Sequence, residues 1–157
     1  MDKNLERFLK SINYTDNLDT LTSAKVSKVL YIKKEDLYEV YIENDQILPL
    51  DIVLSLIDKS KKGINGTDKC YIKFKYNKLD KDIIVEYLNY LFTNLKNKKA
   101  SLVSLNNDDL TIDDNNIIID VSSKTEQDKL KQELNKLESH LKDFGIDGFN
   151  ISVNLNE

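Results

Sequence analysis

The sequence is poor in the residues that most often carry chemistry. It has no tryptophan and only one cysteine, one proline, one histidine and one arginine. A single thiol, Cys70, excludes an internal disulfide and fits a reducing compartment, so we expect a cytoplasmic protein. His140 has no cysteine or second histidine with which to form a zinc site. Arg7 is the only arginine among many lysines, which we interpret as an AT-rich coding bias.

Long apolar runs and targeting signals are also missing. The longest apolar runs are a few residues, far short of the roughly 20 that a membrane helix needs. Residues 1–5 are polar and lack the apolar centre of a secretory signal. We therefore expect no contact with a membrane.

Motifs for catalysis and cofactor binding are absent as well. No Ser-His-Asp set can be assembled, and the phosphate-binding sequence G-x-x-x-x-G-K-[ST] does not occur. The carboxylates of Asp108, Asp109, Asp113 and Asp114 could hold a metal, but they flank a predicted hairpin turn and lack the spacing of a calcium loop. We predict no catalytic residue, no metal, no cofactor and no small-molecule ligand for this chain.

What the sequence does contain is the composition of an ordinary soluble protein. Of its residues, 40% are hydrophobic and 32% are charged. Its length of 157 residues is enough for one domain or two small ones. The formal net charge is −4, with acidic and basic residues interspersed. A free-standing nucleic-acid binder would more often be basic.

Apolar residues recur with helical and strand periods along the whole chain. The seam of Leu130, Leu134, Leu137 and Leu141 is too short for a coiled coil and favours a helix lying on a sheet. The predicted elements are a helix over 5–12, strands over 26–32 and 37–42, a helix over 50–61, a strand over 70–76, a helix over 81–97, strands over 110–112 and 117–121, a helix over 124–144 and a strand over 149–155.

The order of these elements repeats when the sequence is shifted by 79 residues. The shift places Val40 on Ile119 and Gly66 on Gly145. It also superimposes the first predicted helix on the third and the strand over 70–76 on the last strand. Repetition at this length indicates two related modules.

The repeat defines the predicted fold. We expect an α/β (α+β) protein of two modules, 1–79 and 80–157, each with the order helix, strand, strand, helix, strand. Each module should form a small antiparallel or mixed sheet covered by helices on one face.

Two G-x-x-G turns, over residues 63–66 and 145–148, invite comparison with KH domains, in which such a loop clamps a nucleic-acid backbone. In KH domains that loop joins two helices, whereas here each turn leads into a predicted strand. Glycine is also required where helices end in a left-handed residue, and we favour that reading. The alternative nucleic-acid surface around the first turn consists of Lys59, Lys61, Lys62, Gly63, Gly66 and Lys69.

The predicted strand after Gly66 alternates cleanly between apolar and polar residues. One side should therefore face the core and the other solvent or a partner. On the face opposite the helices we predict partner-binding residues, namely Tyr41, Tyr71, Lys73 and Lys75. The alternative left open is that the second module buries this face.

Several stretches together resemble the N-terminal region of the PolC-type DNA polymerase III α subunit, the replicative polymerase of low-GC Gram-positive-type bacteria. The stretches in the first module are the helix over 5–12, the hairpin after it and Ile47-Leu48-Pro49. Those in the second module are Ile117-Ile118-Ile119-Asp120-Val121, Lys129-Leu130, Phe144-Gly145 and Gly148-Phe149-Asn150-Ile151-Ser152-Val153. The second module also resembles, more distantly, domain I of the initiator DnaA and the C-terminal domain of the clamp-loader τ subunit.

The resemblance implies modules related to type II KH domains that serve protein interaction. It implies a non-catalytic region that docks the polymerase to replisome partners such as τ. The family continues into an OB-fold, a PHP domain with an inserted 3′–5′ exonuclease and a polymerase core, which contact DNA. None of these lies within 157 residues, so we expect a fragment of a larger DNA-directed DNA polymerase, a nucleotidyltransferase. The alternative is a KH-like single-stranded nucleic-acid-binding domain that uses the turn over 63–66.

Overall fold

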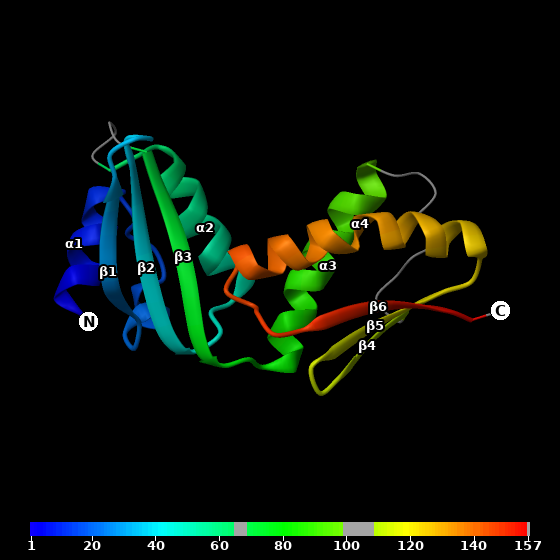
Figure 1. Cartoon of the computed structure of the whole chain (residues 1–157). Coiled ribbons are helices and arrows are strands. Elements are labelled where there is room, and N and C mark those ends of the chain that lie inside the picture. The colour runs from blue at the N-terminus through cyan, green and yellow to red at the C-terminus, as the bar shows by residue number, and fades with distance from the viewer. Residues whose placement is uncertain (65–68, 99–108, 157) are drawn as a thin grey trace. The chain divides into compact units, whose positions relative to one another are not determined.

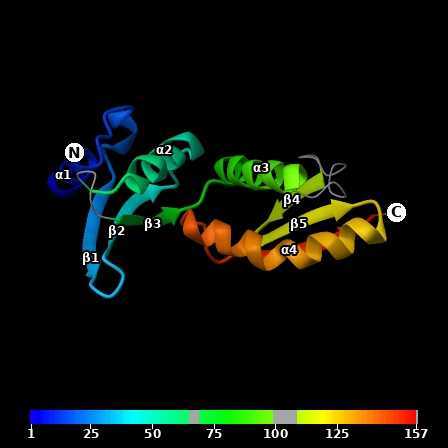
Figure 2. The same cartoon turned by 90° about the horizontal axis from the view of Figure 1, so that it is seen from above.

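The chain forms two compact units, Met1–Ile83 and Ile84–Glu157, in a computed structural model that describes residues 1–64, 69–98 and 109–156 (Figures 1 and 2). The first unit contains α1 (Lys3–Ser11), a 3₁₀ helix (Leu18–Leu21), β1 (Lys25–Ile32), β2 (Leu37–Gln46), α2 (Leu50–Lys61) and β3 (Lys69–Lys78). The chain continues with α3 (Lys81–Lys98), β4 (Leu110–Asp113), β5 (Asn116–Val121), α4 (Lys124–Asp143) and β6 (Asn150–Leu155). Two three-stranded mixed sheets with accompanying helices confirm the predicted α/β class.

The first helix is held at its start by Asp2. The carboxylate of Asp2 accepts a hydrogen bond from the backbone N–H of Leu5 at 3.0 Å and another from the N–H of Val26 at 3.2 Å. One side chain therefore caps α1 and ties it to β1. A cap of this kind stabilises a helix by roughly 1 kcal/mol.

The first sheet has the strand order β1-β2-β3. β1 runs antiparallel to β2, as the short turn between them dictates, and β3 runs parallel to β2. A parallel neighbour needs a long crossover, which α2 supplies. Pro49 is the N-cap residue of α2, one position before the helix, where a missing N–H leaves no intrahelical bond unmade.

The core of the first unit lies between its sheet and its helices. The inward side chains of the sheet are those at alternating positions of β2 and β3, as predicted for β3, and they are buried against α1 and α2. These side chains are Val40, Ile42, Cys70, Ile72 and Phe74. Burial raises the pKa of the Cys70 thiol to about 11, which leaves it protonated and unreactive at neutral pH.

The second unit repeats this plan with β4 antiparallel to β5 and β5 parallel to β6. α4 begins where the Ser123 hydroxyl oxygen accepts a hydrogen bond from the N–H of Glu126 at 3.1 Å, which is one half of a capping box. The helix packs on β5 and β6 through Leu130, Leu137 and Leu141, which are buried. The leucine seam therefore lies on a sheet, as expected.

The two sheets differ in the register of their parallel strands. Val40 lies opposite Ile72 in the first sheet, whereas Ile119 lies opposite Val153 in the second. The shift of 79 residues places Ile72 on Ile151, so the parallel pair has slid by two residues. A slide of two keeps the same side chains facing the core, because only an odd shift would turn them outward.

The division between the two units falls within α3, between Ile83 and Ile84. The boundary expected from the sequence, between residues 79 and 80, stays a prediction. The kinship with type II KH domains likewise remains an expectation drawn from the sequence.

Candidate functional site

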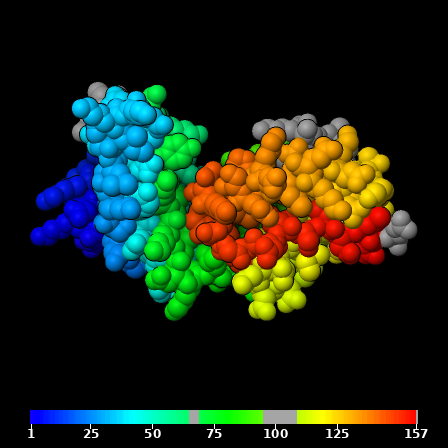
Figure 3. Space-filling model, in the orientation of Figure 1, coloured from blue at the N-terminus to red at the C-terminus, as the bar shows by residue number. Residues whose placement is uncertain are grey.

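The candidate site is the face of the first sheet that points away from α1 and α2, which we call the outer face (Figure 3). Strand register and alternation assign side chains to it, because directly paired residues share a face. Its members are Lys25, Lys28, Leu30 and Ile32 of β1, Leu37, Glu39, Tyr41 and Glu43 of β2, and Lys69, Tyr71, Lys73 and Lys75 of β3. The four predicted partner-binding residues lie together on this face.

A network of polar side chains occupies the middle of the outer face. The Tyr41 hydroxyl donates to Glu39 Oε2 at 2.9 Å, and Lys73 Nζ lies 3.3 Å from the same oxygen. Lys28 Nζ lies 4.4 Å from the centroid of the Tyr41 ring, and Lys73 Nζ lies 5.6 Å from it. The Tyr41 ring is therefore held in place by cations and a carboxylate.

The network shifts the pKa values of its two ionised members in opposite directions. The hydrogen bond from Tyr41, with a further contribution from Lys73, lowers the pKa of Glu39. The hydrogen bond to Glu39 raises the pKa of Lys73. The ionised Glu39 carboxylate stabilises the folded state fully above the ordinary carboxyl pKa, and this stabilisation is lost as pH falls through the lowered pKa. The stabilisation by Lys73 is complete below its ordinary pKa and is lost as pH rises through the raised value, so the pair persists across neutral pH.

Replacing Glu39 by glutamine should bring the Lys73 pKa down toward its ordinary value, because the main cause of the shift is removed. An NMR titration of the Lys73 ammonium group measures this. Glu43→Gln is the matched control, since Glu43 pairs with Lys25 at 3.7 Å and should leave Lys73 unchanged. A Lys73 pKa that does not respond to Glu39→Gln would contradict the network.

Around the network the outer face is apolar and basic. Tyr71 is 58% exposed and Leu30 is 43% exposed, and the two flank Glu39 in one row across the sheet. Both carboxylates of the face already pair with lysines, Glu39 with Lys73 and Glu43 with Lys25. Lysines outnumber carboxylates on this face although the chain as a whole is acidic. The arrangement suits a macromolecular contact.

The first G-x-x-G turn follows α2 and serves the end of that helix. Gly63 has a φ of 82° and its N–H donates to the carbonyl of Ser60 at 2.9 Å. Only glycine adopts this left-handed conformation without strain. Lys61 and Lys62 are exposed beside it, Lys59 is half-buried in α2 and Lys69 begins β3. Gly66 lies outside the described residues.

The second G-x-x-G turn has the same geometry at the end of α4. Gly145 has a φ of 87° and its N–H donates to the carbonyl of Lys142 at 2.9 Å. This equivalence supports a structural role for the first glycine of both turns. A nucleic-acid role for the lysines around the first turn stays a prediction.

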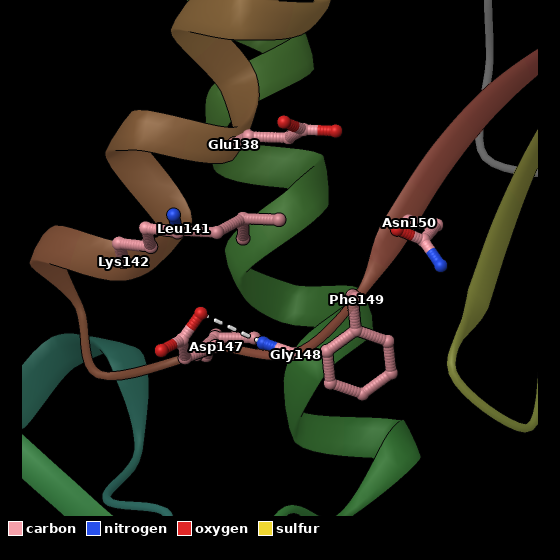
Figure 4. A pocket seen from close by; sticks show the side chains of 8 residues that line it. Glu138, Leu141, Lys142, Asp147, Gly148, Phe149 and Asn150 are labelled. Carbon is pink, nitrogen blue, oxygen red and sulfur yellow. Dashed lines mark hydrogen bonds between the residues drawn. The ribbon is translucent and has the colours of Figure 1, made fainter.

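A hollow of about 280 Å³ lies beside the second turn (Figure 4). Its lining combines both charges with apolar groups, and Asp147 is engaged by the N–H of Gly148 at 2.8 Å. The lining residues are Glu138, Leu141, Lys142, Ile146, Asp147, Gly148, Phe149 and Asn150. Its two carboxylates are those of Asp147 and Glu138, and the lining contains no histidine or cysteine.

Metal binding and membrane insertion find no support in the part of the chain that the structure describes. No group of three or more histidine, cysteine, aspartate or glutamate side chains gathers in that part. Asp113 and Asp114 lie at the turn between β4 and β5, and Asp108 lies outside the described residues. None of the helices within the described ranges is long and apolar enough to cross a membrane.

Fold and site together define a pair of small α+β modules whose candidate site is a surface on the first sheet. Comparison with protein families gives a match for each module. Residues 4–76 match the family DNA polymerase III polC-type N-terminus I, and residues 86–157 match DNA polymerase III polC-type N-terminus II. The chain therefore belongs to the PolC-type DNA polymerase III family, as an N-terminal region of this replicative enzyme.

The two matches cover nearly the whole chain in the order that the family predicts, which confirms the resemblance seen in the sequence. Neither a search of the curated proteins nor a search of the solved structures finds a match.

Proposed function

We propose that this chain is a non-catalytic docking region that attaches a PolC-type polymerase to a protein partner of the replisome, with the clamp-loader τ subunit as the first candidate. The observation that carries the proposal is the outer face of the first sheet, where Tyr71 is 58% exposed among lysines and no helix in the described part of that unit covers it. Exposed aromatic side chains of this kind are frequent anchors of protein interfaces.

A comparison with the second unit supports placing the partner contact on the outer face of the first unit. Its sheet also has a face turned away from the core, but the residues there are mostly small or polar and include two carboxylates. They are Thr111, Asp113, Asn116, Ile118, Asp120, Asn150, Ser152 and Asn154. Asn154 Nδ2 donates to Asp120 Oδ1 at 2.9 Å, so these two side chains satisfy each other. Of the two repeated faces, the first therefore has the stronger anchors.

Titration of the full chain with purified τ in a calorimeter tests the proposal. Replacing Tyr71 by alanine should weaken binding about thirtyfold, because an aromatic anchor at an interface contributes roughly 2 kcal/mol. Lys75→Ala should weaken binding less and should reduce its dependence on salt. The matched control is Asn154→Ala on the corresponding face of the second unit, which should leave the affinity unchanged.

The outcomes separate the surface from the identity of the partner. Binding of τ that survives replacement of Tyr41, Tyr71, Lys73 and Lys75 by alanine would remove the outer face from consideration. If the wild-type chain does not bind τ, a pull-down with the other replisome proteins decides whether another partner uses this face. Failure of all of them to bind would overturn the docking function.

The competing function is single-stranded nucleic-acid binding around Gly63. A titration with single-stranded DNA at several salt concentrations, run beside the τ experiment, distinguishes the two. Affinity that falls steeply with salt and drops in Lys61→Ala and Lys62→Ala would favour the nucleic-acid function. We expect little affinity at physiological salt, since the chain carries a net charge of −4.

Polymerase and 3′–5′ exonuclease activity, contact with DNA and a cytoplasmic location belong to the same proposal for the full-length enzyme. Reading the gene downstream of codon 157 tests this inexpensively. An open frame that continues into exonuclease and polymerase motifs is the expected result, and an immediate stop codon would contradict it.

A further inference from the structure

A hollow of about 390 Å³ lies between α1 and β1, on the core side of the first sheet. It is separate from the outer face, because it opens on the opposite side of β1. Its lining is Asn4, Arg7, Phe8 and Ser11 of α1, Val26, Ser27, Lys28 and Val29 of β1, Val40 of β2 and Ile64. The size is at the lower end of the range of ligand pockets, roughly 300–1,000 Å³, and exceeds the gaps of ordinary packing.

Val29 shows that the core is incomplete at this place. Val29 lies directly opposite Val40 across the antiparallel pair, so both side chains are on the core side. Val40 is fully buried, but Val29 is 51% exposed. A valine on the core side of a sheet is normally covered by a helix, and here α1 covers Val26 and leaves Val29 open to the hollow.

The charge at the rim of the hollow is positive. Its lining contains Arg7 and Lys28 and no carboxylate. Lys28 Nζ is placed over the Tyr41 ring on the outer face, so Arg7 is the cation available to an occupant. Within the described ranges Arg7 forms no ion pair, while the neighbouring Glu6 pairs with Lys10 at 3.5 Å. The planar guanidinium of arginine is well suited to hold a carboxylate through two hydrogen bonds.

We infer that this hollow is a second docking site, which takes a segment of a partner protein that presents a large apolar side chain beside a carboxylate. The apolar side chain covers Val29 and Phe8 and completes the core. The carboxylate pairs with Arg7 at the rim. Because the hollow and the outer face lie on opposite sides of β1, this inference stands independently of the docking of τ at Tyr71.

A library of random peptides displayed on phage and selected on the immobilised full chain tests the inference. The expected peptides carry aspartate or glutamate next to leucine, isoleucine or phenylalanine. A synthetic peptide of the selected sequence should bind at least about tenfold more weakly to Val29→Glu and to Arg7→Glu. Arg7→Lys should retain part of the affinity, because lysine keeps the charge and loses the two-pronged geometry.

The controls separate a specific site from a folding defect and from the outer face. Tyr71→Ala should leave peptide binding unchanged, although it should weaken the binding of τ. Circular dichroism and the backbone amide NMR spectrum of Val29→Glu should match the wild type away from the hollow, since Val29 is already half exposed. Peptide-induced shifts should centre on Phe8, Val26 and Val29.

Four results of the peptide experiments would overturn the inference. They are recovery of no binding peptide, selected peptides without acidic residues, binding that Val29→Glu leaves intact, and shifts centred on Tyr71. A concentration-dependent dimer of the wild type that Val29→Glu abolishes would also overturn it, because the occupant would then be a second copy of this chain.

Discussion

Shortening Ile42 to alanine should destabilise the first unit by about 2–5 kcal/mol. Ile42 is fully buried in the central strand, and it lies between Val26 on one neighbouring strand and Phe74 on the other. The smaller side chain leaves a cavity that both neighbours line, and a core so bounded relaxes only in part. For a unit of this size the loss is a large fraction of the total stability.

Hydrogen exchange of the β2 and β3 amides measures this loss of stability within the first unit. A single unfolding curve of the two-unit chain would mix the stabilities of both units. The control is Tyr71→Ala, because this substitution removes an even larger side chain from a neighbouring strand, but one that points outward. Its 58% exposure predicts a change within about 0.5 kcal/mol. Equal effects of the two substitutions would mean that the alternation of β2 and β3 has been assigned to the wrong faces.

Alternating strands were predictable because one face of each is buried. Val40 and Ile42 of β2 face the core as the pattern indicates. The strand itself runs on to Gln46, beyond the predicted end at residue 42, and through a polar stretch that gives no apolar signal. Asn44 is buried there because its amide donates to the carbonyl of Gln46 at 2.6 Å and its oxygen accepts from Ser23 at 2.8 Å. Such hydrogen bonds offset the cost of burying an amide and leave no periodic pattern in the sequence.

The segment between the predicted helix over 5–12 and the predicted strand over 26–32 contains structure that the sequence did not indicate. A 3₁₀ helix spans Leu18–Leu21, and Leu21 and Tyr14 are both buried against the first core. Burial raises the pKa of the Tyr14 hydroxyl, with further contributions from nearby carboxylates. Isolated apolar residues in a polar segment have no periodicity, so their burial depends on packing that only the folded unit provides.

The candidate site was predictable in its members and not in its chemistry. Alternation alone placed Tyr71 and Lys73 on the outer face. The network of Tyr41, Glu39 and Lys73 depends on the parallel register of β2 and β3, which sets Tyr41 opposite Lys73. The sequence contains no marker of that register. The hollow beside Val29 escaped prediction for a related reason, because it depends on how far α1 reaches along β1.

Replacing Tyr87 by alanine should destabilise the second unit by about 3–5 kcal/mol, comparable to the loss of a large aromatic residue from other cores. Tyr87 is fully buried on the apolar side of α3. Its ring centroid lies 5.3 Å from that of Phe144, the residue that ends α4. The pair therefore joins two helices that are far apart in the sequence, and hydrogen exchange of the α4 and β6 amides should report its loss.

A double-mutant cycle distinguishes the aromatic contact from simple loss of buried area. Tyr87→Ala and Phe144→Ala remove the same contact, so their combined effect should fall short of the sum by about 0.5–1.5 kcal/mol. Tyr90 provides the control, because its centroid is 6.4 Å from Phe144 and its side chain is only partly buried. Tyr90→Ala should cost less and couple more weakly to Phe144→Ala. Strict additivity of the Tyr87 and Phe144 substitutions would show that α3 and α4 are held together by other contacts.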